Sequence, residues 1–379
     1  MARRYDVCVV GLGAAGSQAA WQLARRGRRV LGLDRYDPPH EVGSTHGASR
    51  IIREAYFEGA LYVPLVRRAY DLWEQLERES QTSLLQITGG LWIGDPDGEM
   101  VRGCRMAAAE HDVAIRVLDP DAARDEFPMF AIAPTAVAVH ERRAGILRPE
   151  AAVRAAFGCA RAAGADLRPG TNVLGWDVFA GGVRVHTTDG AHEAAQLILA
   201  AGPWTAELAP QLAPALTVER QLTVWLRQAT AVDPAMPVWF WDAGPETAAY
   251  GFPPDGGLIK LARHHHGEAT TPDSVDRAVG DGEAAAVRDL AQQLLGAAAG
   301  PVERASVCLY TNTPDEHFAI GPLPGAERVT LVSACSGHGF KFASAVGELA
   351  ADIADGETPQ LDISAFDPAR LVAGLAAAD

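Results

Sequence analysis

The feature that most constrains this chain is a glycine-rich turn near its start, Gly11-Leu12-Gly13-Ala14-Ala15-Gly16. The apolar run at residues 7–10 precedes the turn, and a helical pattern follows it as far as Gly27. A second predicted strand, residues 29–33, then ends on Asp34. Strand, glycine turn, helix, strand and acid in this order are typical of a unit that binds an adenine dinucleotide. We therefore predict that this part of the chain binds such a cofactor.

Each part of this unit has a physical role in holding a dinucleotide. Gly11 permits the tight turn, Gly13 lets the backbone approach a pyrophosphate, and Gly16 lets the helix pack closely against the strand. The first turn of the helix presents free backbone N–H groups and the positive end of its dipole to the phosphates. Asp34 ends the second strand, where its carboxylate can accept hydrogen bonds from a ribose hydroxyl.

The length and charge of the chain limit its organisation and its partners. A chain of 379 residues is too long for one typical hydrophobic core and suggests two domains. Its composition, 48% hydrophobic and 21% charged, is that of a soluble globular protein. The formal net charge of -15 argues against nucleic-acid and anionic-membrane partners, because phosphate binding requires a basic surface.

The cysteines and histidines favour neither disulfides nor a metal site. The five cysteines are scattered and form no CxxC pair, which indicates a reducing compartment. No run approaches the ~18–20 apolar residues of a membrane span, so we predict a cytoplasmic protein. Consecutive residues on a strand point to opposite faces, so His264, His265 and His266 cannot all bind one ion, and we predict no metal site.

Periodic patterns predict the remaining helices and strands. Residues 36–49 are polar and without periodicity, so we predict a long loop held by a ligand. Leu65, Ala69, Leu72 and Leu76 recur at helical spacing. Further helices are predicted at residues 100–111, 121–126, 149–163, 284–295 and 342–353. Strands are predicted at residues 89–94, 166–168, 172–179, 183–187, 197–200, 237–241, 248–252, 258–262, 307–310 and 329–333.

The order of these elements predicts two interleaved domains. The strand at 197–200 ends in Ala201-Gly202-Pro203-Trp204, which again places backbone near a dinucleotide. From Glu219 onward, alternating apolar and polar residues indicate an antiparallel sheet with a hairpin over 248–262. We predict a dinucleotide-binding domain from residues 1–85, 145–215 and 310–379, and a substrate-binding domain from residues 86–144 and 216–309.

Three residues stand at chemically unusual positions. Lys341 follows a glycine turn at a helix start. A cation there is disfavoured by the positive end of the helix dipole, unless an anion lies between the cation and the helix. It is a candidate for holding a substrate carboxylate, and the alternative is a solvated surface lysine. Lys260 lies in an apolar strand, where it must snorkel, pair or be functional. By composition alone, Cys308 is best interpreted as a buried, inert thiol.

Seven motifs, in order and correctly spaced, cover nearly the whole chain. They are GLGAAGS (11–17), DPPHEVGSTHGASRIIREAY (37–56), GILRPE (145–150), YGFP (250–253), IKLARH (259–264), VCLYTNTPDEHF (307–318) and SGHGFKF (336–342). With them the chain resembles monomeric sarcosine oxidase and N-methyltryptophan oxidase, within the D-amino-acid-oxidase-like flavoproteins. The resemblance implies an α/β fold, in which a Rossmann-like FAD-binding domain is interleaved with a second domain built on a mixed, mainly antiparallel β-sheet.

The resemblance implies that the dinucleotide is FAD. It also implies that Cys308 carries the flavin covalently, as a thioether to the 8-methyl group, which reverses the interpretation of Cys308 as inert. The residues implied to contact FAD are Gly11, Gly13, Ala14, Ala15, Gly16, Asp34, Arg35, Ser44, Ser49, Arg50, Val173, Ala201, Gly202, Trp204, Cys308, Gly337, His338, Gly339, Phe340 and Lys341.

The same resemblance assigns roles at the substrate. Arg53 and Lys341 resemble the pair that fixes a substrate carboxylate. Tyr250 and His264 are implied to form walls of the pocket, with Tyr56 and Tyr310 nearby. Lys260 is implied to activate oxygen near flavin N5, since a cation there stabilises superoxide, and Arg50 to support negative charge on the ring.

Some positions depart from the family pattern. Ala48 stands where an acidic residue is frequent, while Ser49 keeps a hydroxyl. Cys335 stands where an aromatic residue is common, and His265 and His266 extend the usual single histidine. These departures bear on substrate size and rate rather than on the cofactor or the reaction.

The implied activity is oxidation of sarcosine or a related N-methyl amino acid by a monomeric enzyme. A hydride equivalent passes to flavin N5, the imine hydrolyses to formaldehyde and a primary amino acid, and oxygen is reduced to hydrogen peroxide. Alternative substrates are N-methyltryptophan, proline or pipecolate, and a glycated amino acid. The first rival function is a flavin dehydrogenase with a quinone or protein acceptor, against which Lys260 argues. The second is a catalytically silent flavin-binding protein, against which Arg53, Lys341 and Lys260 argue. The third is an NAD(P)-dependent imine reductase, which would give Cys308 no role.

Overall fold

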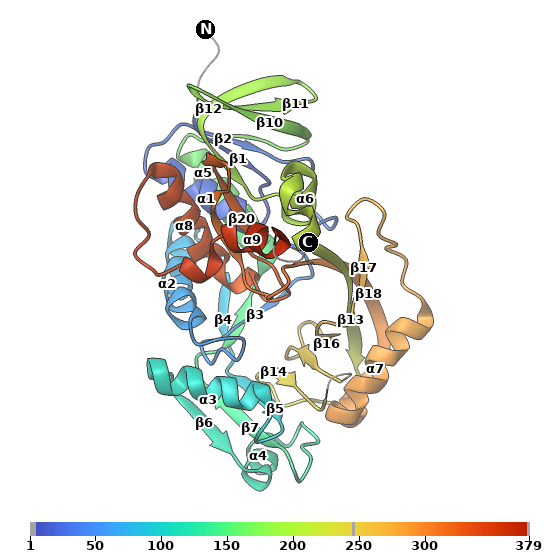
Figure 1. Cartoon of the computed structure of the whole chain (residues 1–379). Helices are drawn as coiled ribbons and strands as arrows, with labels where there is room; N and C mark the ends of the chain where they lie inside the picture. Colours follow the sequence, from blue (N-terminus) through green and yellow to red (C-terminus); the bar gives the residue numbers. More distant parts are fainter. Residues whose placement is uncertain (1–4, 245–246, 377–379) are drawn as a thin grey trace.

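Two large sheets and a small one organise the chain (Figure 1). The computed structural model describes residues 5–244 and 247–376. The eight-stranded sheet contains β1 (Tyr5–Val10), β2 (Val30–Leu33), β9 (Asp166–Arg168), β10 (Val173–Phe179), β11 (Gly182–Thr187), β12 (Gly190–Leu199), β19 (Ala319–Leu323) and β20 (Ala326–Ser333). Its central strands β9, β2, β1, β12 and β20 are parallel. β1, β2 and the second half of β12 are mainly apolar and buried, as parallel strands covered on both faces are.

Helices cover one face of this sheet. α1 (Ala14–Arg25) packs against α5 (Pro149–Ala162) and α8 (Ala343–Asp355), and α2 (Tyr62–Ser80) packs against α5 and α8. Pro149 occupies the first position of α5, where its missing N–H costs nothing. The periodic residues Leu65, Ala69, Leu72 and Leu76 of α2 are all buried in this layer, as the sequence predicts.

The second sheet has nine strands and is mainly antiparallel. It contains β5 (Gly90–Gly94), β6 (Ile115–Leu118), β7 (Val137–Glu141), β13 (Thr217–Gln228), β14 (Val238–Trp241), β15 (Ala249–Gly251), β16 (Leu258–Arg263), β17 (Glu268–Thr270) and β18 (Ala299–Asn312). Its neighbours pair antiparallel, except that β14 and β5 are parallel. The predicted hairpin is β15 and β16. The apolar face of α7 (Asp281–Leu295) packs on this sheet. The predicted fold class is confirmed.

Several short elements escaped the sequence patterns. β3 (Arg50–Ile52), β4 (Leu85–Ile87) and β8 (Gly145–Leu147) form a three-stranded sheet whose partners are far apart in sequence. α9 (Ala369–Ala376) lies beyond the helix that was predicted to be the last. The helices α3 (Glu99–His111) and α4 (Pro120–Glu126) occur as predicted, and α6 (Thr205–Leu208) is a single turn after β12.

The strands also bear on the domain borders. The predicted border between residues 309 and 310 falls inside β18, which runs without interruption from Ala299 to Asn312. The border between residues 85 and 86 falls inside β4. The division into two domains stays a prediction, with β18 shared between them. Among the helices that the structure describes, none combines the length and the apolar character that crossing a membrane requires.

Candidate active site

One cavity joins the two parts of the chain that the sequence singles out. At one end it is lined by Gly11, Gly13 and Asp34, from the turn between β1 and α1 and the end of β2. At the other end it is lined by Tyr250 of β15 and by His264, which follows β16. The predicted dinucleotide turn and the predicted substrate residues therefore face the same space.

The three glycines of the turn differ in what surrounds them. Gly11 has a φ of +87°, and a Cβ there would lie 2.3 Å from the Ala200 carbonyl oxygen. A Cβ on Gly16 would lie 1.8 Å from the Gly11 carbonyl oxygen. A Cβ on Gly13 would meet only Thr45 Oγ1, at 3.5 Å. The protein's own backbone thus requires glycine at 11 and 16, whereas at 13 the free space belongs to the cavity.

The start of α1 is suited to an anion. Its N-cap is Gly13, which has no side chain to satisfy the first N–H groups, and its first turn contains no acidic residue. Ala14 and Ala15 line the cavity, and the Ala14 N–H makes a long hydrogen bond to Thr45 Oγ1, at 3.3 Å. Amides at the positive end of a helix dipole favour a phosphate.

The carboxylate of Asp34 is buried and oriented by the backbone. It accepts hydrogen bonds from the amides of Leu12 at 2.7 Å and Tyr36 at 2.8 Å. Burial raises the pKa of Asp34, and these two hydrogen bonds oppose that shift. Each carboxylate oxygen keeps a lone pair for a further donor, as a ribose hydroxyl would supply.

Arg35 and Trp204 border the same end of the cavity. The Arg35 guanidinium lies 3.2 Å from Asp273 and 6.0 Å from the centre of the Trp204 ring. Trp204 Nε1 donates to Asp273 at 2.9 Å, so one carboxylate holds both side chains. The other predicted cofactor residues of this region, Val173, Ala201 and Gly202, also line the cavity.

Two orphaned hydroxyls indicate a polar ligand in the middle of the cavity. The side-chain oxygens of Ser44 and Thr311 are buried and have no hydrogen-bond partner among the residues that the structure describes. Both residues line the cavity. Because buried polar groups in proteins are nearly always paired, these two positions fit a ligand that carries donors and acceptors, as a flavin dinucleotide does.

Cys308 lies beside this polar patch. It is buried on β18 and lines the cavity, with Sγ 3.6 Å from the Ser44 carbonyl oxygen and 3.8 Å from the Arg50 guanidinium. The same guanidinium donates to the carbonyl oxygens of Ser44 at 3.0 Å and Ser49 at 2.9 Å. Cys308 is therefore buried, as its composition predicts, and it is also presented to the ligand space.

Lys260 is fully enclosed by protein. Its Nζ donates to the Ser49 carbonyl oxygen at 2.6 Å and lies 4.7 Å from the centre of the Phe252 ring. Burial, reinforced by the nearby Arg50, lowers the pKa of Lys260 well below its ordinary value. Lys260 does not itself line the cavity among the described residues, and it approaches the cavity through the backbone of Ser49.

Lys341 is buried rather than solvated, so the surface-lysine alternative is wrong. Only 6% of it is exposed, and it lines the cavity from a short 3-10 turn, Phe340–Phe342, that precedes α8. Burial, together with the charge of Arg53, lowers the pKa of Lys341 to about 7. A buried lysine that is only partly protonated at neutral pH gains by meeting an anion.

Arg53 already has a carboxylate partner within the protein. One guanidinium nitrogen donates to both Glu58 oxygens, at 2.6 and 2.5 Å, and the other donates to the Ala55 carbonyl oxygen at 2.9 Å. Burial alone raises the pKa of Glu58, but Arg53 outweighs it and lowers the pKa to about 2. Arg53 and Glu58 both line the cavity, so an entering carboxylate meets an occupied guanidinium.

Aromatic rings form the walls around these charges. The His264 ring lies 5.5 Å from that of Phe240, 6.2 Å from that of Tyr250 and 6.5 Å from that of Tyr310. Burial and the neighbouring His265 lower the pKa of His264 well below its ordinary value, which leaves a neutral imidazole. Three other aromatic residues, Phe57, Trp92 and Phe240, also line the cavity. They were not predicted, because single aromatic residues carry no spacing signal.

Most of the predicted site residues line this cavity, but four do not. The exceptions are Gly16, Ser49, Tyr56 and Lys260, which lie behind it. Glu58 was missed, although its place five residues after Arg53 was a signal that the two side chains could meet. Within residues 5–244 and 247–376, no three His, Cys, Asp or Glu side chains are placed to hold a metal ion.

Comparisons with known proteins agree with this arrangement. The chain is 39% identical to monomeric sarcosine oxidase from Streptomyces avermitilis, over 98% of this chain and 99% of that protein. It is 35% identical to N-methyl-L-tryptophan oxidase from Yersinia pestis, over 97% and 99% respectively. The solved structure of NikD, an unusual amino acid oxidase essential for nikkomycin biosynthesis, superimposes with a TM-score of 0.85 at 28% identity, covering 97% of this chain and 98% of that one.

A family model settles the assignment. The model described as FAD dependent oxidoreductase matches residues 6–353, which include the glycine turn, Cys308 and Lys341. The relatives named above match over almost the full length of the chain. The chain therefore belongs to the FAD dependent oxidoreductase family.

Proposed function

We propose that the protein is an FAD-dependent oxidase of sarcosine or of a related N-methyl or secondary amino acid. The names and identities of the two relatives, a sarcosine oxidase and an N-methyl-L-tryptophan oxidase, support the substrate class. The observation that carries the proposal is that one cavity is lined by the glycine turn, by Cys308 and by Arg53 and Lys341. A cofactor site that opens onto buried cations is suited to an anionic substrate.

The residues present fit FAD. The glycine turn, Asp34 and the start of α1 would hold its ribose and pyrophosphate, and the orphaned hydroxyls of Ser44 and Thr311 would be satisfied by a polar ring. When bound, FAD supplies a two-electron acceptor that takes a hydride equivalent from the substrate and later passes two electrons to oxygen, giving hydrogen peroxide. Attachment through the Cys308 thiol is part of the proposal, supported by its place on the cavity wall.

The chain's own residues bind and orient the substrate. The ammonium of Lys341 and the guanidinium of Arg53 would hold its carboxylate, with Glu58 yielding part of its contact to Arg53. The rings of Tyr250, His264 and Phe240 exclude water from the opposite side. Fixing the carboxylate while keeping the amine in a dry space orients the N-methyl group for oxidation.

Lys260 and Arg50 would act on the oxygen reaction. Both side chains are enclosed near Ser49, and positive charge there, on Arg50 and on Lys260 when it is protonated, favours the transfer of negative charge to oxygen. This role favours an oxidase over a dehydrogenase that uses a quinone or a protein as its acceptor. A monomeric, cytoplasmic enzyme completes the proposal.

The test is an anaerobic titration of the purified yellow protein with sarcosine, followed by N-methyltryptophan and proline. Loss of the flavin colour, reversed by air with release of hydrogen peroxide, supports the oxidase. Bleaching that air does not reverse, but an added quinone does, would make the protein a dehydrogenase. A flavin that none of the secondary amino acids bleaches would overturn the proposed function.

A further inference from the structure

Lys341 is held by a set of buried hydrogen bonds. Its Nζ donates to the His338 carbonyl oxygen at 2.7 Å and to the Tyr56 hydroxyl at 3.3 Å. Its own carbonyl oxygen accepts a hydrogen bond from Trp73 Nε1 at 2.9 Å, which fixes the backbone. An ammonium group has three N–H donors, so one remains for the cavity that Lys341 lines.

The direction of the hydrogen bonds beyond Lys341 follows from the chemistry of the partners. His338 Nε2 lies 3.1 Å from the Glu316 carbonyl oxygen, which can only accept, so Nε2 carries the proton. Burial lowers the pKa of His338 to about 3, so its ring is neutral and Nδ1 is an acceptor. The Tyr56 hydroxyl, 2.6 Å from Nδ1, therefore donates to it and keeps its oxygen lone pairs for Lys341.

The carbonyl at the far end of this chain belongs to a strained turn. Glu316 has a φ of +58°, a conformation that non-glycine residues rarely adopt. Thr313 holds the turn, since its hydroxyl donates to the His317 carbonyl oxygen at 2.6 Å and contacts Asp315 at 3.0 Å. Strained backbone persists only where the surroundings determine it, so this turn is built to keep its shape.

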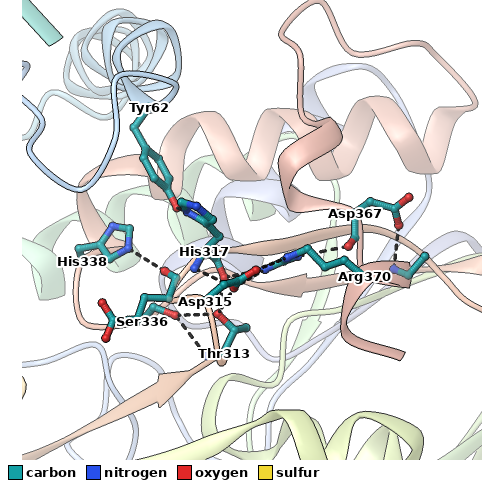
Figure 2. A network of polar contacts seen from close by, with 10 residues as sticks. Tyr62, Thr313, Asp315, His317, Ser336, His338, Asp367 and Arg370 are labelled. Atoms are coloured by element: carbon teal, nitrogen blue, oxygen red, sulfur yellow. Dashed lines mark hydrogen bonds and ion pairs between the residues drawn. The ribbon is translucent and has the colours of Figure 1, made fainter. Parts of the chain in front are cut away.

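The C-terminal helix α9 anchors the turn, as Figure 2 shows. Arg370 donates to Asp315 at 2.7 and 3.0 Å and to the His317 carbonyl oxygen at 3.0 Å. On the other side, the Tyr62 hydroxyl of α2 lies 3.0 Å from His317 Nδ1. A guanidinium that binds a carboxylate through two nitrogens fixes the geometry of the pair in addition to neutralising its charge.

We propose that Tyr56 and His338 are positioning residues for Lys341, and that the turn of residues 313–317, anchored by Arg370, sets the place of His338. Together they aim one N–H of Lys341 into the cavity and so tune the affinity for the substrate carboxylate. This inference rests on the proposed function, in which Lys341 binds that carboxylate. It gives the C-terminal helix a part in substrate recognition although α9 does not line the cavity among the described residues.

Amide side chains separate the two hydrogen bonds of His338. His338→Asn places an acceptor oxygen near the Nδ1 position and loses the donor to Glu316, whereas His338→Gln places a donor near Nε2 and loses the acceptor for Tyr56. Tyr56→Phe keeps the ring and removes only the hydroxyl. Arg370→Ala removes the anchor, and Arg184→Ala, which breaks the exposed ion pair with Glu193 at 2.7 Å, is its matched control.

The readout is anaerobic flavin reduction, which gives an apparent Kd and a limiting rate. For sarcosine, Tyr56→Phe and His338→Gln should each raise the apparent Kd about tenfold with a smaller change in the limiting rate. The double variant should be no worse than Tyr56→Phe alone, because that change already removes both the hydrogen bond to His338 and the one from Lys341. His338→Asn should raise the apparent Kd for sarcosine less than His338→Gln does. Arg370→Ala should also raise this Kd, whereas Arg184→Ala should leave it unchanged. For N-methylethanolamine, which has no carboxylate, none of these variants should change the apparent Kd.

Equal effects on sarcosine and N-methylethanolamine, or additive effects in the double variant, would overturn the inference. A second measurement does not depend on turnover. In protein labelled with 15N-histidine, the signal that disappears in His338→Gln should be that of a neutral ring protonated at Nε2. The other tautomer, or a charged ring, would refute the proposed direction of the hydrogen bonds. If the wild-type flavin is not bleached at all, the proposed function fails while the labelling result still decides the geometry.

Discussion

The guanidinium of Arg53 is bonded to the carboxylate of Glu58, inside the cavity where a substrate carboxylate would bind. The protein thus carries its own competitor for this cation. We predict that Glu58→Gln binds acetate about tenfold more tightly than the wild type, because the guanidinium is released from a charged partner. The same change should lower the free energy of unfolding by about 3 kcal/mol, since it leaves a buried charge poorly paired.

Acetate titrations followed by flavin absorbance, combined with thermal unfolding, check this prediction. Added acetate should raise the melting temperature of Glu58→Gln more than that of the wild type, because a ligand stabilises in proportion to its occupancy. Glu193→Gln, at the surface ion pair with Arg184, serves as the control. Equal affinity of both proteins for acetate would show that Glu58 does not compete at Arg53.

Anion binding should weaken as the pH rises through about 7. Burial lowers the pKa of Lys341 to about 7, so it is an ammonium below that pH and an amine above it. The titratable groups around Lys341 change charge far from pH 7. The pKa of Glu58 is about 2, that of His338 is about 3 and that of Tyr56 is well above 10. The nearby Arg53 and Arg50 stay charged. The Kd of acetate should therefore rise by up to about tenfold per pH unit above pH 7.

Acetate is a suitable probe because its own charge is constant between about pH 6 and pH 9. Bound acetate raises the pKa of Lys341, so the rise in Kd should level off at higher pH. Lys341→Arg, which keeps its charge over this range, should show a flat profile. A rise that persists unchanged in Lys341→Arg would assign the titration to another group.

The proposed covalent attachment of FAD would depend on the thiol of Cys308. Cys308→Ser removes the nucleophilic sulfur and adds an atom of similar size, so the fold and the cavity should persist. We predict that acid precipitation leaves the wild-type pellet yellow and the Cys308→Ser pellet colourless, with FAD in the supernatant. Cys335→Ser is the control, because Cys335 also lines the cavity. A colourless pellet from the wild type would mean that FAD is held without a bond to protein.

The charge of Lys260 should matter for oxygen and not for the substrate. Lys260→Met is expected to slow flavin reoxidation about 10²-fold and flavin reduction far less, because it removes the amine that, once protonated, places positive charge where negative charge develops. Lys260→Gln keeps a donor for the Ser49 carbonyl oxygen but carries no charge, so it separates charge from packing. Stopped-flow measurement of flavin reduction and of flavin reoxidation tests this prediction. Equal slowing of the two half-reactions would rule out a role of Lys260 in the oxygen reaction.

Substitution of two glycines of the turn should affect different properties of the protein. A Cβ on Gly16 would lie 1.8 Å from the Gly11 carbonyl oxygen, so Gly16→Ala should destabilise the apoprotein itself. A Cβ on Gly13 meets only Thr45 Oγ1 at 3.5 Å, so Gly13→Ala should fold normally and lose FAD. Thermal unfolding of the apoprotein and the FAD content after reconstitution distinguish the two; an apoprotein of Gly13→Ala that melts much earlier would contradict this account.

The sequence predicts best where chemistry is local. The glycine turn, Pro149 at a helix start and the hairpin of β15 and β16 are each determined by a few neighbouring residues, and each occurs as predicted. The burial of Lys341 could not be predicted in this way, because it depends on Trp73 and Tyr56, which come from segments far away in the chain. The local sequence of a short polar segment does not show whether a distant helix or water covers it.

The charge pairs show the same limit. Arg53 was identified by its motif. Its hydrogen bonds to Glu58 could be predicted only with the conformation of the backbone between the two residues. β3, β4 and β8 are three residues long each and exist only because they pair with one another. A strand of this length has no periodicity of its own, so its existence is a property of the tertiary structure.

The order of the strands has a consequence for how the molecule is made. The parallel core of the eight-stranded sheet takes β1 and β2 from the first tenth of the chain and β20 from residues 326–333. A nascent chain that ends before β20 lacks the strand beside β12 and the later turn at Gly337-His338-Gly339, which also lines the cavity. Such a topology, rich in contacts between distant residues, folds slowly. The coenzyme is therefore expected to be acquired after synthesis of the whole polypeptide, and fragments that contain the glycine-rich turn alone should not retain it.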